Sequence, residues 1–92
     1  MDLAFDDMAV IERYLSGFYP GTWPRFAQTL EDEVSRLSSH PYIGALYKPD
    51  SDYRWIMAED YLVFYKVNET EKRVYIHRIL HGARDIQQYL SS

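Results

Sequence analysis

The chain has 92 residues and a mass of 11.0 kDa, which leaves room for one domain, 1–92, with a small core. Apolar residues make up 47% and charged residues 26%, which excludes a disordered or collagen-like chain. No apolar run approaches the roughly 18 residues that a membrane-spanning helix needs. Asp2, Asp6 and Asp7 stand where a secretory signal would be basic and then apolar. With no cysteine to support disulfides or thiolate chemistry, we expect a cytoplasmic protein.

The net charge of −4 argues against a protein that binds nucleic acid mainly through its phosphates, because such proteins are usually basic. The charge is uneven, however. The excess of acid lies entirely in residues 1–50, whereas residues 51–92 are balanced. Residues 72–84 contain no acid and carry a basic set, namely Lys72, Arg73, His77, Arg78, His81 and Arg84. This stretch is where a partner should be sought.

The first half of the chain has the period of amphipathic helices. Apolar residues recur every three or four positions over 4–18, and again from a cap at Thr22 to Leu37. The segment 16-SGFYPG-21 contains two glycines and a proline, so it separates the two helices. The pattern therefore predicts two antiparallel helices joined by a short turn.

After 38-SSHPYIG-44 the period changes from 3.6 to 2. Residues 53–58, 61–68 and 73–80 are rich in aromatic and β-branched residues, and the short segments between them fit hairpin turns. A last helix is predicted over 83–90. The order indicates an α+β fold in which a helical hairpin packs on a three- to four-stranded antiparallel sheet, followed by a short C-terminal helix.

The middle strand, 61–68, is apolar on both sides. Leu62 and Phe64 alternate with a second set made up of Tyr61, Val63, Tyr65 and Val67. An antiparallel sheet usually keeps one face in water, so either a partner covers the second face or this is a central strand with tyrosines that reach the solvent. If a partner covers the second face, we expect that face to contain Tyr61, Val63 and Tyr65, together with Tyr75 of the next strand.

The segment 77-HRILHGARD-85 is the most specific local feature. Gly82 allows a sharp exit from the strand, which would bring His81 and Arg84 together as an anion site. Alternatively, Arg78 or Arg84 pairs with Asp85 or with an acid of the helices. The two histidines are too far apart on a strand to share a metal, at about 13 Å. The sequence contains no nucleotide-binding or serine-nucleophile motif, and we expect no metal and no cofactor.

The strings 61-YLVFYKV-67 and 74-VYIHRILHGARD-85 resemble the C-terminal signature of the RelE/ParE superfamily of toxins from type II toxin–antitoxin systems. The similarity extends back through 53-YRW-55, 41-PYIG-44 and 11-IERYLSGFYPG-21, and so covers nearly the whole chain. It implies a growth-inhibiting plasmid stabilisation protein that a cognate antitoxin neutralises. The superfamily normally has a strand before the first helix. Here only residues 1–3 precede that helix, so we expect an exposed sheet edge that could pair with another chain, and a homodimer is one possible partner arrangement.

The resemblance implies two targets. In a ParE-like protein the target is DNA gyrase, bound by a protein–protein contact, whereas a RelE-like protein cleaves mRNA on the ribosome. The ribonucleases carry lysines on the sheet, where this chain has Tyr53, Trp55 and Leu62. This difference favours gyrase, and an inactive, antitoxin-binding relative remains a third alternative.

The resemblance also implies site residues. If the protein is a ribonuclease, its catalytic candidates are Arg84, His81, His77 and Arg54. The candidates for antitoxin or target binding are Tyr61, Val63, Tyr65, Tyr75, Arg78, Arg84 and Tyr89.

Overall fold

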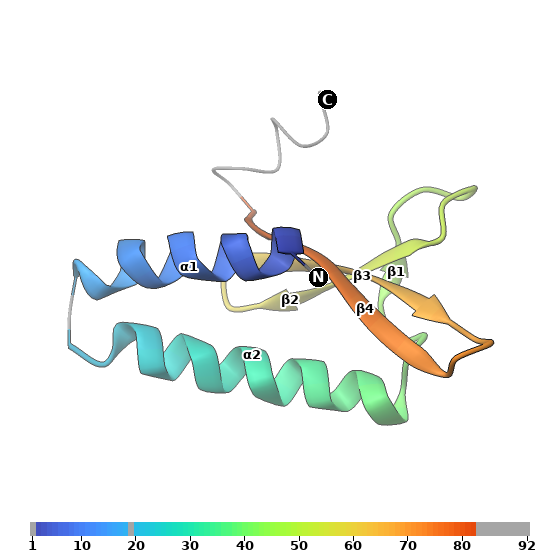
Figure 1. Ribbon diagram of the computed structural model, residues 1–92, viewed down its shortest axis with the longest axis horizontal. Helices are drawn as coiled ribbons and strands as arrows, with labels where there is room; N and C mark the ends of the chain where they lie inside the picture. The colour runs from blue at the N-terminus through green and yellow to red at the C-terminus, as the bar shows by residue number, and fades with distance from the viewer. Residues whose placement is uncertain (1, 19, 83–92) are drawn as a thin grey trace.

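A helical hairpin forms the first half of the molecule. The computed structural model describes residues 2–18 and 20–82 (Figure 1). Helix α1 spans Asp2–Ser16 and α2 spans Thr22–Ser39, which confirms the predicted pair. The residue that caps α2 is Gly21 rather than Thr22; Gly21 has φ 93°, a conformation that glycine adopts without strain. The predicted helix over 83–90 lies outside the described residues.

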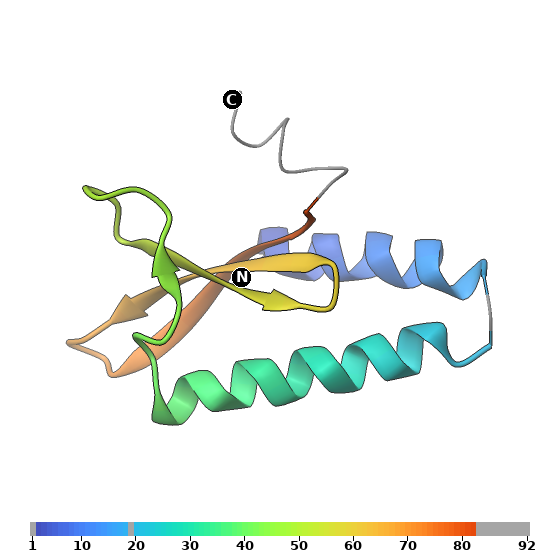
Figure 2. The ribbon, with the colours of Figure 1, turned by 180° about the vertical axis from the view of Figure 1, so that it is seen from behind.

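The second half is a four-stranded antiparallel meander in the order β1-β2-β3-β4. Three strands match the prediction: β2 (Tyr53–Ala58), β3 (Tyr61–Asn68) and β4 (Arg73–His81). The additional strand β1 contains only Ala45 and Leu46 and pairs with β2. In Figure 2 the loop between β1 and β2 stands clear of both helices. The predicted α+β fold is therefore confirmed for the described residues.

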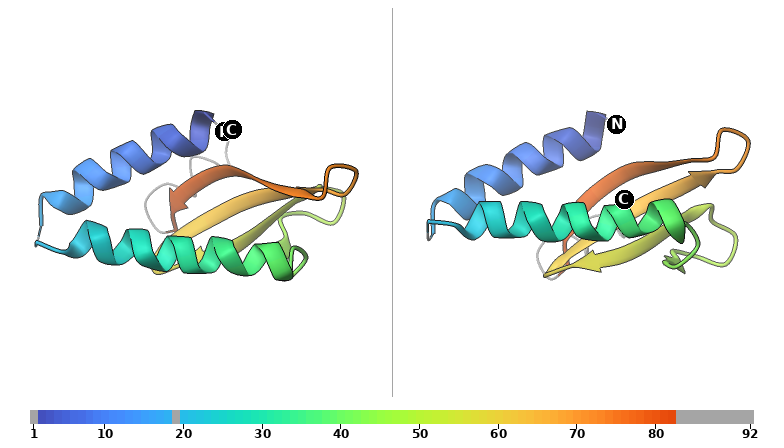
Figure 3. Two further views of the ribbon diagram at one scale, coloured as in Figure 1. Left: turned by 60° about the horizontal axis from the view of Figure 1, so that its bottom comes forward. Right: turned by 90° about the horizontal axis from the view of Figure 1, so that it is seen from below.

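The core lies between the helices and one face of the sheet. Ile11 of α1 and Phe26 and Leu30 of α2 pack there with a set of strand residues, namely Ala58, Tyr61, Val63 and Ile79. The helices meet at their turn and diverge from it, so that the N-terminal end of α1 lies beside β4 (Figure 3). We call this side of the sheet the helix face and the opposite side the open face.

The prediction that Tyr61, Val63 and Tyr65 face outward is wrong. Their side chains are 4%, 0% and 0% exposed and lie on the helix face. The two sets alternate along β3 as predicted, but both are apolar, so the sequence pattern does not distinguish the set that the helices cover. The open face carries the other set, where Phe64 is buried with its ring 5.6 Å from that of Tyr47.

Strand β4 is one edge of the sheet, and no described strand pairs with its outer side. Part of this edge is nevertheless occupied, because the backbone N–H of Ile79 donates a hydrogen bond of 2.9 Å to the Asp7 carboxylate of α1. The predicted open edge is thus present among the described residues. Along one part of it, the Asp7 carboxylate accepts the hydrogen bond that a neighbouring strand would otherwise accept. Within the described residues, no helix is long and apolar enough to cross a membrane.

Candidate binding surface on the open face of the sheet

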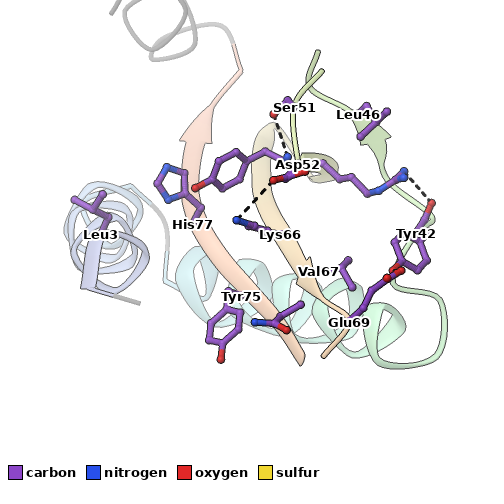
Figure 4. A pocket seen from close by; sticks show the side chains of 13 residues that line it. Leu3, Tyr42, Leu46, Ser51, Asp52, Lys66, Val67, Glu69, Tyr75 and His77 are labelled. Atoms are coloured by element: carbon purple, nitrogen blue, oxygen red, sulfur yellow. Dashed lines mark hydrogen bonds and ion pairs between the residues drawn. The ribbon is translucent and has the colours of Figure 1, made fainter. Parts of the chain in front are cut away.

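A groove of about 900 Å³ lies at the end of the sheet where β2 begins and β3 ends (Figure 4). We call it the open-face groove. It is lined by side chains from β2, β3 and β4, from the N-terminal turn of α1 and from the segments that flank β1. These residues are Leu3, Tyr42, Leu46, Ser51, Asp52, Tyr53, Arg54, Lys66, Val67, Asn68, Glu69, Tyr75 and His77.

Tyr53 links the polar groups of this groove. The centroid of its ring lies 4.8 Å from the centroid of the His77 ring. The Nζ atom of Lys66 lies 5.9 Å from the same Tyr53 centroid. The sheet register sets this arrangement, because Tyr53 stands directly opposite Lys66 on the neighbouring strand. Lys66 also forms an ion pair of 3.8 Å with Asp52. Charged and aromatic groups therefore share one surface, and its aromatic residues are of the kind that is enriched in protein–protein interfaces.

His77 reaches the open face because β4 is irregular at this point. Phe64 pairs with Arg78 and Tyr65 pairs with Ile76, so His77 is an extra residue in a β-bulge. In a regular strand His77 and His81 would share a face. Burial lowers the pKa of His77, with the neighbouring Arg78 adding to the effect and Asp7 opposing it, so the imidazole is neutral near pH 7.

His81 lies on the helix face instead. It stands opposite Tyr61 in the register, and its ring packs edge-on against that of Tyr61 with centroids 5.2 Å apart. Tyr61 belongs to the core, whereas His77 packs on Tyr53 of the open face. The two catalytic candidates thus lie on opposite sides of the sheet and cannot act on one bond as an acid–base pair.

The Arg78 guanidinium is held by an acid of the first helix. Its Nε and Nη2 donate hydrogen bonds of 2.8 and 3.1 Å to the two carboxylate oxygens of Asp7. This bidentate geometry fixes both side chains, and the same carboxylate accepts the Ile79 amide. Of the two alternatives left by the sequence, the structure confirms that Arg78 pairs with an acid of the helices.

Arg54 is engaged by the segment 41–44. Its Nη1 donates to the carbonyl oxygen of Gly44 at 2.8 Å and to that of Tyr42 at 3.4 Å, and its guanidinium lies 5.1 Å from the centre of the Tyr42 ring. Tyr42 donates a hydrogen bond to Glu69, which raises the pKa of the Tyr42 phenol above its ordinary value. Arg54 therefore shapes one wall of the groove.

Tyr65 also holds the segment 41–44 in place, through hydrogen bonds to its two ends. The Gly44 amide donates to the Tyr65 hydroxyl at 2.9 Å, and that hydroxyl donates to the Pro41 carbonyl at 2.8 Å. A Cβ at position 44 would lie 2.6 Å from the hydroxyl and 2.7 Å from the carbonyl oxygen of Trp55, so only glycine fits. These contacts explain why the string 41-PYIG-44 ends in glycine. The buried Tyr65 positions this segment, which forms one wall of the groove, although Tyr65 itself does not line the groove.

Of the predicted site residues, the groove brings together Arg54, Tyr75 and His77. The Tyr75 hydroxyl donates to Glu71, which raises the pKa of the Tyr75 phenol. Arg84 and Tyr89 lie outside the described residues. Sequence reasoning missed Lys66 and Asp52, although the predicted hairpin already placed Lys66 next to Tyr53 across the turn. Among the described residues, no group of three histidine or acidic side chains could hold a metal ion.

The fold and the groove together define a class: a small α+β domain in which helices bury one face of an antiparallel sheet and the other face is available for contacts. Comparison with protein families gives the particular member of this class. The model of the family described as "ParE toxin of type II toxin-antitoxin system, parDE" matches residues 1–86, nearly the whole chain. The chain therefore belongs to the ParE toxin family of type II toxin–antitoxin systems. A search of curated proteins finds no match.

Proposed function

We propose that this ParE-family toxin inhibits DNA gyrase by a protein–protein contact made through the open-face groove. Membership of the ParE family supports a toxin of this type. The observation that carries the proposal is the separation of the two histidines: His77 packs on Tyr53 and His81 packs on Tyr61, on opposite faces of the sheet.

The arginines support the same interpretation. Ribonuclease chemistry needs a cation beside the scissile phosphate and a base within hydrogen-bond reach of the 2′-hydroxyl. Arg78 is paired with Asp7, and Arg54 donates to two backbone carbonyls. Neither guanidinium is arranged to receive a phosphate, whereas a surface that carries several tyrosines suits recognition of a protein partner.

We also propose that a ParD-type antitoxin neutralises the toxin by covering the open-face groove. The family's systems pair a toxin with such an antitoxin, as the name parDE indicates. The groove offers Tyr53, Tyr75 and His77 as contacts, together with the exposed apolar side chains of Leu3 and Leu46. A segment that covered these groups would exclude gyrase from the same surface.

One experiment separates the two targets. The protein is induced in cells, and both plasmid topology and the cleavage of a translated message are followed. Double-strand DNA breaks with intact message are expected. Codon-positioned cuts in the message, without DNA breaks, would overturn the gyrase proposal in favour of the ribosome-dependent ribonuclease.

A second experiment tests the surface. Purified toxin is added to a gyrase supercoiling assay, with Lys66→Glu as the groove variant and Lys48→Glu, which makes the same charge change outside the groove lining, as the control. We expect Lys66→Glu to weaken inhibition about tenfold or more, because it reverses a charge within the contact, and Lys48→Glu to change it by less than about threefold. Equal effects of the two variants would place the contact elsewhere.

A further inference from the structure

A second cavity, of about 760 Å³, lies between the C-terminal turns of α2 and the β3–β4 hairpin. Val34 and Leu37 line it from α2, and Val67, Lys72 and Val74 are among the residues that line it from the hairpin. None of the described residues of α1 lines this cavity, since the two helices diverge from their turn (Figure 3). We call this cavity the hairpin pocket.

Part of the lining of the hairpin pocket is aliphatic. Val67 and Val74 stand directly opposite each other in the register of β3 and β4. Val34 and Leu37 are three residues apart, so they lie on one side of α2. Leu37 is buried, whereas the three valines are half-buried. A cavity of this volume with an apolar lining has the character of a small-molecule site.

The hairpin pocket also carries an excess of positive charge. Lys72 and Arg73 line it, are exposed, and form no ion pair within the described part of the chain. The nearby acids Glu69 and Glu71 each accept a hydrogen bond from a tyrosine hydroxyl instead. Of these two acids only Glu69 lines the pocket, so the charged lining has two cations against one acid, a net charge of +1. The whole chain, in contrast, has a net charge of −4.

We propose that the hairpin pocket binds a small aliphatic carboxylate, with its hydrocarbon chain against the valine and leucine side chains and its carboxylate at Lys72 and Arg73. A guanidinium matches the two oxygens of a carboxylate, and the lysine adds a point charge. A monoanion neutralises the net charge of the lining. A phosphate dianion would exceed that charge and would be repelled by Glu69.

The hairpin pocket and the open-face groove share a wall. Four residues line both cavities, and Figure 4 labels them: Tyr42, Val67, Glu69 and Tyr75. A carboxylate in the hairpin pocket therefore contacts side chains that also shape the groove, which provides a route for coupling between the two sites. Binding of the carboxylate itself does not depend on the gyrase proposal, and it is measured on the purified full chain without any target.

The test is a titration of the isotopically labelled full chain with octanoate, followed by the chemical shifts of its backbone amides. We expect saturable shifts centred on Leu37, Val67 and Val74, with a dissociation constant of about 0.1–1 mM. The uncharged 1-octanol should bind at least about tenfold more weakly, and octyl phosphate about threefold more weakly. The absence of saturable shifts, shifts centred on the open-face groove, or equal affinity for octanoate and 1-octanol would overturn the proposal. Tighter binding of octyl phosphate would overturn the assignment of a carboxylate.

Variants of the two cations test where the carboxylate binds. Lys72→Gln and Arg73→Gln should each raise the dissociation constant for octanoate about three- to tenfold, and should change that for 1-octanol by less than about twofold. Lys48→Gln is the matched control, because it removes the same charge from an exposed lysine outside the pocket lining. An equal effect of Lys48→Gln would show that only the net charge of the chain matters, which would overturn the site. Binding of an acidic amphipathic peptide in the pocket, without binding of octanoate, would replace the small ligand by a protein partner.

Discussion

The two faces of this sheet are made by the same strands, but they differ in how their side chains are held. On the helix face, Val63 and Tyr65 are fully buried, and the core fixes their positions. On the open face, Tyr53 and Lys66 are held by the neighbouring strand and by Asp52 at the surface. The comparison teaches that the helix face supplies stability and positions the segment 41–44, whereas the open face supplies the groups that a partner can contact.

The largest effect is expected for a truncation in the core. Phe26 is 1% exposed and its ring lies 4.8 Å from that of Tyr61, so Phe26→Ala should lower the free energy of unfolding by about 3–5 kcal/mol. Phe5→Ala, at an exposed position of α1, should change it by less than about 0.5 kcal/mol. Urea denaturation measures both. Similar losses in the two variants would contradict the assignment of the helix face as the core.

The next effect concerns the contact between α1 and the edge of the sheet. Asp7→Ala removes both acceptors of Arg78 and leaves the Ile79 amide without its carboxylate, so we expect a loss of about 1.5–3 kcal/mol. Hydrogen exchange should become faster at Ile79 in this variant. Asp7→Asn keeps an oxygen for the amide and should retain part of its protection. Unchanged exchange at Ile79 in Asp7→Ala would show that the carboxylate does not shield this edge.

A smaller loss is expected when the buried tyrosine loses its hydroxyl. Tyr65→Phe leaves the Gly44 amide without its acceptor and should lower the free energy of unfolding by about 1–2 kcal/mol. Because this amide belongs to a wall of the groove, the variant should also weaken partner binding although Tyr65 touches no partner. Tyr53→Phe, on the open face, is the control and should change stability by less than about 0.5 kcal/mol. Equal losses in the two variants would show that the Tyr65 hydroxyl does not hold the segment 41–44 in place.

The smallest effect is a dependence on pH. The pKa of His77 is lower in the folded chain than its ordinary value of 6.5, so near and below this pH the unfolded chain binds more protons than the folded one. The free energy of unfolding should therefore fall as the pH decreases from about 7 through the folded pKa of His77. His77→Gln should flatten this decrease, whereas His40→Gln, at an exposed position after α2, should not. Denaturation series at several pH values measure the slopes, and an unchanged slope in His77→Gln would contradict the assignment.

Most of the architecture follows from the sequence because period and length are strong signals. The change from a 3.6-residue period to a 2-residue period at 40–53 separates the helical hairpin from the meander. The two residues of β1 are too few to show a period, so this strand emerges only when it pairs with β2. The family resemblance, which rests on strings spread over the chain, is confirmed by the match over residues 1–86.

The groove was harder to predict for two physical reasons. Both sets of side chains on β3 are apolar, so alternation fixes which residues share a face without fixing which face the helices cover. The β-bulge at His77 then shifts the alternation of β4 by one residue, which separates His77 from His81. Contacts between distant segments, such as Arg54 with the carbonyl of Gly44 or Arg78 with Asp7, leave no periodic signal at all.

The edges of this sheet bear on how the chain avoids aggregation while it is being synthesised. Exposed strand edges template the addition of further strands, which is a route to fibres. At one edge, β1 offers only two residues, too short a template for a stable added strand. At the other, the Asp7 carboxylate occupies the Ile79 amide and interrupts the row of donors along β4. Asp7 belongs to α1 and precedes β4 in the chain, so the group that protects this edge is already synthesised when β4 is made.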